Sequence, residues 1–309
     1  MAALLPTAAI GQSPAAKLSA ALRAKQPDQR IEAIDAVLES GSADSERWLA
    51  PLLTDKDWEI QEHAARAIGK LGERKELKGK AALNKLISLA TDGKTVRLRR
   101  AAAAAIALIN AEQGAKSIFK KAKSKRQVRA LEALAIVLRA RPPFAGADKI
   151  KKLLSAEHPR LREAAARAWL EAAPDRNGAL KTLMSSSHLA VRCLALEAIA
   201  AAPRAEDLKQ VVSLFRGAGQ NEVVTRRIVR ALAAIIVASD GDRAAIAKTV
   251  LAASATGDMT LTRRASLVPI LCRGEQPVFD EKAAVAALRP CLRAEAARPR
   301  AAAAKALRE

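Results

Sequence analysis

Cationic side chains are the residues of this chain that could most readily do chemistry, and that chemistry is the binding of anions. Lys and Arg together number 53 against 32 Asp and Glu, which gives a formal net charge of +21. Such a surplus favours a nucleic acid, an anionic membrane surface or an acidic protein as the partner. A solvated basic surface without a ligand is the alternative interpretation.

One set of cations belongs to a pattern that recurs along the chain. In residues 161–173, LREAAARAWLEAA, a bulky apolar residue is followed by Arg, by small residues four and five places on, and by Trp eight places on. These positions share one face of an α-helix, so the stretch predicts an amphipathic helix that a neighbouring helix can approach closely. The pattern starts at Gln29, Ile60, Leu98, Val128, Leu161, Val191, Val224, Leu261 and Pro299.

The spacing of these starts, about 30 to 40 residues, is typical of repeats that each hold one helix pair. We therefore predict an all-α fold, a right-handed α-solenoid (superhelix) of about nine helix pairs over residues 15–309. Only 2% of the residues are aromatic, which suits a thin, two-layer solenoid better than one large core. Pro142 and Pro143 favour a kink at residues 141–147.

Residues 1–14 are expected to be a disordered tail or the remnant of a signal segment. The three cysteines show no metal-binding spacing, and reduced thiols point to a reducing compartment. We therefore expect a cytoplasmic protein, with export as the alternative if the N-terminus is a remnant signal peptide. A transmembrane segment is not expected.

The candidate binding residues lie at solvent-facing positions two and six places after the pattern starts, or directly beside them. The basic bias sharpens toward the C-terminal half, and cations spaced in this way could contact a phosphate backbone or the carboxylates of a protein. The set consists of Arg66, Arg100, Arg167, Arg226, Arg227, Arg230, Arg263 and Arg264.

A second basic patch follows in the fourth and fifth units. Three of its lysines are spaced by four and three residues, so they share one face of a helix. A contact role and a solvated outer face are both open interpretations. The patch consists of Lys116, Lys120, Lys123, Lys149 and Lys152.

Catalytic residues are not indicated by the sequence. The histidines, His63, His158 and His188, lie in different units, and no HExxH, GxSxG or GxxxxGK[ST] motif is present. The two DxD-like stretches, at residues 55–57 and 240–242, are typical of turns. We expect no cofactor and no metal.

The repeats resemble HEAT repeats of the short type also found in phycobilisome lyase-like proteins. The stretches that carry the resemblance are LAPLLTDKDWEIQEHAARAIGKLG and LLSAEHPRLREAAARAWLEAA. The resemblance implies a scaffold whose second helices line the concave surface. It also implies that Arg early in each second helix pairs with an Asp or a carbonyl of the neighbouring turn. The arginines concerned are Arg99, Arg129, Arg162 and Arg192, with Asp92, Glu157 and Asp258 as candidate partners.

We therefore predict a non-catalytic HEAT-repeat scaffold that binds an acidic protein partner on its basic concave surface. The alternative is a nucleic-acid-binding solenoid that contacts the phosphate backbone. A third hypothesis is a HEAT-like DNA glycosylase for alkylated bases, which would need Trp and Asp in one cleft. Trp58, beside Asp55 and Asp57, is the aromatic residue nearest to that requirement.

Overall fold

The computed structural model describes residues 19–40, 42, 44–74, 81–122, 126–140, 143–217, 221–239, 242–252, 258–272 and 277–308. The chain divides into two compact units, Met1–Pro174 and Asp175–Glu309, called unit 1 and unit 2 here. Helices and turns make up the described parts of both units, and no strand occurs in those ranges. The predicted all-α solenoid class is confirmed.

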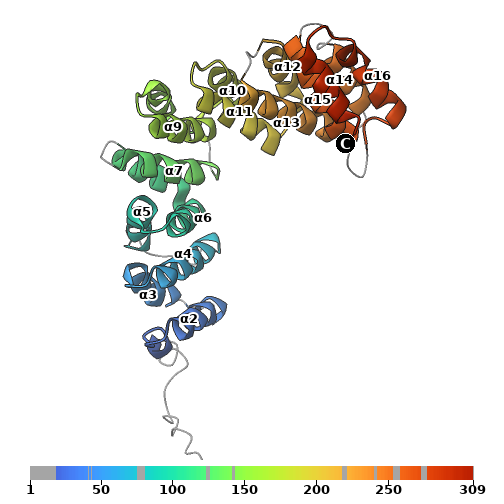
Figure 1. The fold of residues 1–309 in the computed structure, drawn as a ribbon. Coiled ribbons are helices and arrows are strands. Elements are labelled where there is room, and N and C mark those ends of the chain that lie inside the picture. Colours follow the sequence, from blue (N-terminus) through green and yellow to red (C-terminus); the bar gives the residue numbers. More distant parts are fainter. Residues whose placement is uncertain are drawn as a thin grey trace, which may run out of the picture. The chain divides into compact units, whose positions relative to one another are not determined.

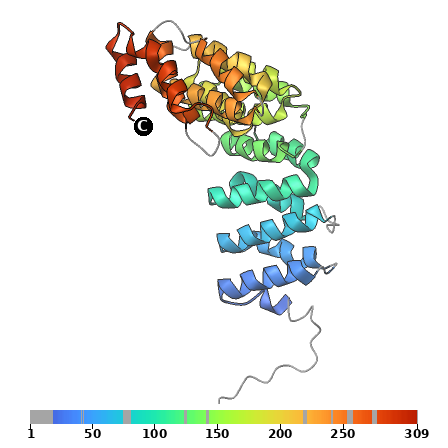
Figure 2. The same cartoon turned by 90° about the vertical axis from the view of Figure 1, so that its right-hand side faces the viewer.

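Unit 1 is a stack of helix pairs (Figures 1 and 2). Its second helices α2, α4, the first part of α6, α7 and α9 pack on one another in chain order, and α3, α5 and α8 belong to the other layer. The elements are α2 (Pro27–Ser40), α3 (Ser45–Leu49), η1 (Ala50–Thr54), α4 (Trp58–Glu73), α5 (Ala81–Asp92), α6 (Val96–Lys121), α7 (Gln127–Leu138), α8 (Ala147–Lys152), η2 (Leu153–Ser155) and α9 (Pro159–Ala172).

Unit 2 repeats the arrangement. Its second helices α11, α13, α15 and α17 pack on one another in order, and the first helices α10, α12 and α16 pack on α11, α13 and α17. The elements are α10 (Arg176–Met184), α11 (Leu189–Ala201), η3 (Ala205–Asp207), α12 (Leu208–Gly217), α13 (Glu222–Ala238), α14 (Arg243–Ala252), α15 (Asp258–Cys272), α16 (Glu281–Leu292) and α17 (Ala297–Ala306).

The second helices α4, α6 and α13 begin where a polar side chain accepts a hydrogen bond from one of their first backbone N–H groups. Asp57 accepts a hydrogen bond of 2.9 Å from the Glu59 N–H at the start of α4. Thr95 accepts one of 3.1 Å from the Leu98 N–H at the start of α6. Such caps supply partners for backbone groups that a helix leaves unpaired at its N-terminus.

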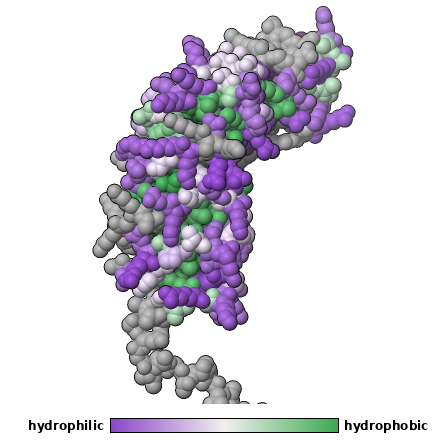
Figure 3. Space-filling view, turned by 90° about the vertical axis from the view of Figure 1, so that its left-hand side faces the viewer, coloured by the Kyte–Doolittle hydropathy of each residue, from purple (hydrophilic) through white to green (hydrophobic). Residues whose placement is uncertain are grey.

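Small residues let the second helices approach closely. Gly69 of α4 lies against α6, so that a Cβ added there would be 3.0 Å from the Ala105 Cα. The apolar starts of the pattern are buried in most units, with Ile60 and Leu98 fully inaccessible. Alanine-rich packing of this kind forms the core of each unit, while hydrophilic side chains cover much of the surface, with hydrophobic atoms visible between them (Figure 3).

Helix α6 serves two successive repeats. Asn110, at φ −160° and ψ 85°, has an extended backbone inside it and separates the second helix of one repeat from the first helix of the next. The Asn110 side chain then accepts a hydrogen bond of 3.0 Å from the Gln113 N–H, which starts the following helical turn. Gly114 leaves room for Ile106, whose Cγ2 would lie 2.1 Å from an added Cβ.

Several predictions about chain organisation are not tested by the structure. Residues 1–14 lie outside the described residues, as do Arg141 and Pro142, so the kink at residues 141–147 stays a prediction. The boundary between the two compact units falls at Pro174 and Asp175. In the described ranges, no helix is both long and apolar enough to cross a bilayer. Cys193, Cys272 and Cys291 are free thiols.

Candidate binding site: a basic groove on the second helices of unit 1

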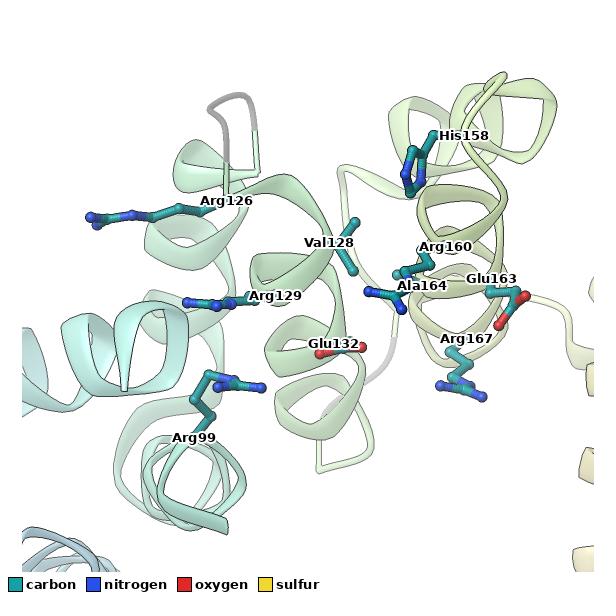
Figure 4. Close-up of a pocket in the computed structure, with 10 residues that line it drawn as sticks. All are labelled: Arg99, Arg126, Val128, Arg129, Glu132, His158, Arg160, Glu163, Ala164 and Arg167. Carbon is teal, nitrogen blue, oxygen red and sulfur yellow. The ribbon is translucent and has the colours of Figure 1, made fainter. Parts of the chain in front are cut away.

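A groove of about 690 Å³ opens where the second helices α6, α7 and α9 of unit 1 meet. Figure 4 shows the residues that line it, with Arg160 of α9 and Glu132 of α7 extending into the space between their helices. The lining residues are Arg99, Arg126, Val128, Arg129, Glu132, His158, Arg160, Glu163, Ala164 and Arg167. We call this the arginine groove.

Helical periodicity positions the charged residues of the arginine groove. On α9, Arg160, Glu163 and Arg167 follow one another at spacings of three and four residues, so they share a face. On α7, Arg129 and Glu132 are three residues apart. The opposite faces of both helices carry buried alanines and large apolar side chains. Core packing therefore turns these charges toward the groove.

Some arginines of this groove already have a hydrogen-bond or ion-pair partner in the protein, and others do not. Arg99 donates a hydrogen bond of 3.0 Å to the Gly93 carbonyl, and Arg126 lies 2.5 Å from an Asp92 carboxylate oxygen. Arg129, Arg160 and Arg167 are exposed and make no hydrogen bond or ion pair within the part of the chain that the structure describes. These three side chains can meet an incoming anion without breaking an existing contact.

A second groove, of about 460 Å³, continues the same surface between α4 and α6. Arg66, Arg97 and Arg100 line it, together with alanines of α6. One oxygen of the buried Glu62 carboxylate lies 2.5 Å from Arg66 and 3.3 Å from Arg97, and Arg100 is exposed. We call the combined surface the second-helix face: Arg66, Arg97, Arg100, Arg129, Glu132, Arg160, Glu163 and Arg167.

Unit 2 uses two of its predicted surface arginines inside the fold. The expected solvent-facing position of Arg263 is wrong, because its side chain is fully buried and donates to the Phe215 carbonyl. Arg264 donates to the carbonyls of Ala287, at 2.6 Å, and Leu251, at 2.8 Å. Burial lowers the pKa of both guanidinium groups. Both arginines tie helices together.

The remaining three predicted arginines of unit 2 come together in a groove of about 330 Å³ between α11 and α13. Arg226 lies 2.6 Å from Glu222 and lowers the pKa of that carboxyl group. Arg227 lies 2.8 Å from Glu197, and this hydrogen bond raises the pKa of Arg227. Arg230 is exposed. Two of these three cations thus have a carboxylate partner within unit 2.

The structure places three of the five lysines of the second basic patch around one groove. Lys116, Lys120 and Lys149 line one groove of about 670 Å³. Lys152 is exposed on α8 but does not line the groove. Lys123 lies outside the described residues.

Arginines early in the second helices bond mainly to backbone carbonyls of the preceding turn. Arg162 donates to the carbonyls of Ala156 and Glu157, both at 2.6 Å, and Arg99 donates to that of Gly93. The first repeat differs, because Arg30 lies 2.6 Å from Asp55 of the next repeat. Such bonds hold each turn against its own helix or the next one.

Within the described residues, Arg129 does not bond to the preceding turn as Arg99 and Arg162 do. The sequence pattern also did not single out Arg97 or Arg160. Asp92 pairs with Arg126, which leaves Arg129 exposed in the arginine groove. Arg97 and Arg160 each stand one place before a pattern start, so the same face of the helix presents them. That shared offset is the sequence signal that could have found them.

The fold and this surface define an α-solenoid of stacked helix pairs with a basic face. Residues 15–107 match the family model for HEAT repeats, which confirms the resemblance predicted from the sequence. The match covers the first third of the chain. No curated protein matches it.

Solved structures with helical repeats are similar to the chain over most of its length. The complex of CpcE and CpcF of phycocyanin lyase from Nostoc sp. PCC7120 is 17% identical, at a TM-score of 0.40, over 82% of this chain and 99% of that one. A tubulin-recruiting TOG domain array of microtubule polymerases is 10% identical, at 0.38, over 93% and 92%. Human deoxyhypusine hydroxylase is 15% identical, at 0.33, over 94% of both chains. Likenesses at these scores carry no inference about activity or partner.

Proposed function

We propose that the chain is a non-catalytic HEAT-repeat scaffold that binds an acidic protein segment across the second-helix face of unit 1. The observation that carries the proposal is the set of exposed arginines that have no partner in the described residues: Arg100, Arg129, Arg160 and Arg167. They come from three successive second helices. A partner that crosses the stack can therefore place one carboxylate on each helix in turn.

The charges of the arginine groove favour a protein over a phosphate backbone. Glu132 and Glu163 stand among the arginines, so a continuous row of phosphates would meet like charges there. A protein segment can alternate acidic side chains with neutral or basic ones and satisfy both signs. No Phe, Tyr or Trp side chain of the described residues lines this groove, whereas non-specific single-strand binding relies on stacking of bases on aromatic side chains.

The test uses a fluorescein-labelled peptide of twelve glutamates and a labelled 20-base-pair DNA duplex, both titrated with the full chain. The variant R129Q/R160Q/R167Q removes three exposed charges of the groove. We expect it to weaken peptide binding about thirtyfold, because three exposed charge contacts of about 0.7 kcal/mol each contribute about 2 kcal/mol together. Fluorescence anisotropy at about 50 and 200 mM salt measures both ligands.

A matched control removes the same charge from unit 2. Arg204, Lys209 and Lys248 are exposed and line none of the grooves described above. The variant R204Q/K209Q/K248Q should change peptide affinity less than twofold. Equal losses in both variants would reduce the binding to net charge and contradict the proposal. DNA binding that is tighter than peptide binding and falls steeply with salt would assign the face to nucleic acid.

A further inference from the structure

We propose that unit 1 carries a second binding site, which takes a short acidic peptide with one large apolar anchor residue. The site is the groove of about 670 Å³ between the end of α6, the end of α7 and α8. It is called the phenylalanine groove here. No residue lines both this groove and the arginine groove, so the inference is independent of the function proposed above.

Two phenylalanines, together with Leu138 and Pro143, are the large apolar residues that line the phenylalanine groove. The Phe119 and Phe144 rings lie 5.4 Å apart between centroids, edge to face at 79°. The chain has only four phenylalanines, and the other two, Phe215 and Phe279, are buried in unit 2. Phe119 and Phe144 are half-buried and line the groove. Paired aromatic side chains in a concave site are typical anchor points for a partner.

The backbone around Phe144 holds its ring in place before any ligand arrives. The Phe144 N–H donates a hydrogen bond of 3.1 Å to the Ala172 carbonyl at the end of α9, and the Ala147 N–H donates one of 2.9 Å to the Phe144 carbonyl. A Cβ on Gly146 would come within 2.3 Å of the Phe144 ring, so glycine makes room for the ring there. A site ordered in this way loses little entropy on binding.

Cations surround the apolar part of the groove. Lys116 and Lys120 stand one turn apart on α6, and Lys149 comes from α8; all three are exposed. Lys116 pairs with Glu112 at 2.7 Å, whereas Lys120 and Lys149 make no ion pair or hydrogen bond among the residues that the structure describes. The surplus positive charge selects carboxylates that flank the anchor.

The chemistry of this site fits a peptide better than a nucleic acid. The two rings lie edge to face, so they do not form two parallel faces between which a base could insert. The volume lies within the range of pockets that enclose a side chain or small ligand. In such a peptide, an aromatic or leucine side chain would pack against the two rings, and flanking Glu or Asp residues would meet the lysines.

The experiment compares two labelled ten-residue peptides, one of glutamates only and one with a central Phe among glutamates. We expect the Phe-containing peptide to bind the full chain about tenfold more tightly. Phe119→Ala should abolish this difference and leave binding of the all-glutamate peptide unchanged. Circular dichroism and the melting temperature check that each variant is folded.

Two lysines on the same helix supply a matched control. Lys149 and Lys152 are both exposed on α8, but only Lys149 lines the groove. Lys149→Glu should weaken binding of the Phe-containing peptide about fivefold, and Lys152→Glu less than twofold. Equal effects of the two substitutions, or equal affinities of the two peptides for the unaltered chain, would overturn the proposal.

The two proposals can fail separately. The variant R129Q/R160Q/R167Q should leave the advantage of the Phe-containing peptide intact, because those arginines do not line the phenylalanine groove. Loss of that advantage in this variant would place the anchor in the arginine groove instead. Tighter binding of a 20-nucleotide single-stranded DNA than of either peptide, with dependence on Phe119, would identify a nucleic-acid site and refute the peptide assignment.

Discussion

Arginines at equivalent positions of the repeat behave differently in the two units. Arg100 and Arg263 both stand two places after a pattern start, yet Arg100 is exposed on unit 1 and Arg263 is fully inaccessible in unit 2. Arg263 donates to a carbonyl of another helix, whereas Arg100 has no partner in the described residues. Arg100 of unit 1 is therefore open to solvent, whereas Arg263 and Arg264 of unit 2 hold helices together.

The largest effect that would test this comparison is on stability. Arg263→Ala should lower the free energy of unfolding by about 3 kcal/mol, because it leaves a cavity and a buried carbonyl without its donor. Arg100→Ala should change it by less than about 0.5 kcal/mol, as exposed positions usually do. Urea unfolding followed by circular dichroism measures both. Equal effects would remove the distinction between the two positions.

The cysteines report on unit 2 alone, because all three lie in it. Burial raises the pKa of the Cys193 and Cys291 thiols, so both stay protonated and shielded at pH 8 in the folded chain. Unfolding returns them toward the ordinary pKa of about 8.5 and exposes them. Arg263→Ala should therefore speed their alkylation, and Arg100→Ala should not.

A smaller effect separates two arginines within α9. Arg162→Ala removes a guanidinium that donates to two carbonyls, and should cost about 1 to 2 kcal/mol. Arg160→Ala, two residues earlier, should leave the melting temperature unchanged and weaken binding of the glutamate peptide. The melting temperature and anisotropy are measured for both variants. A stability loss in Arg160→Ala would assign that residue a structural role.

The smallest effect concerns the exposed pair Arg226 and Glu222. Although Arg226 lowers the pKa of the Glu222 carboxyl group, both side chains are mostly in water, where such pairs contribute little. A lowered pKa means that any stabilisation is present above the ordinary pKa of Glu and is lost as the pH falls through the folded value. Arg226→Gln should leave the melting temperature at pH 7 unchanged. A clear decrease would show that Arg226 stabilises the fold, as Arg263 is expected to do.

Periodicity and capping residues made the fold predictable. The nine pattern starts fall in nine helices of the structure, and Asp57 caps α4. Small residues four and five places on, such as Ala64 and Ala65, are buried. These features depend on local spacing, which the sequence displays directly.

The site was less predictable, because exposure depends on contacts between distant segments. A helical position only says which way the Cα–Cβ bond points, and the long Arg263 side chain reaches a carbonyl 48 residues away. Likewise, Lys149 lies in the same groove as Lys116 and Lys120 because of the path of the chain between α7 and α8, where Phe144 is hydrogen-bonded to the end of α9. No single repeat contains the information for either arrangement.

Helix α6 contributes to both proposed sites. Arg99 and Arg100 lie before Asn110 and belong to the second-helix grooves, while Lys116 and Phe119 lie after it and belong to the phenylalanine groove. The extended backbone of Asn110 therefore separates the residues of the two proposed sites along one helix. If a ligand at one site changed the angle at Asn110, it would change the affinity of the other site, and thermodynamic linkage would make the effect equal in both directions.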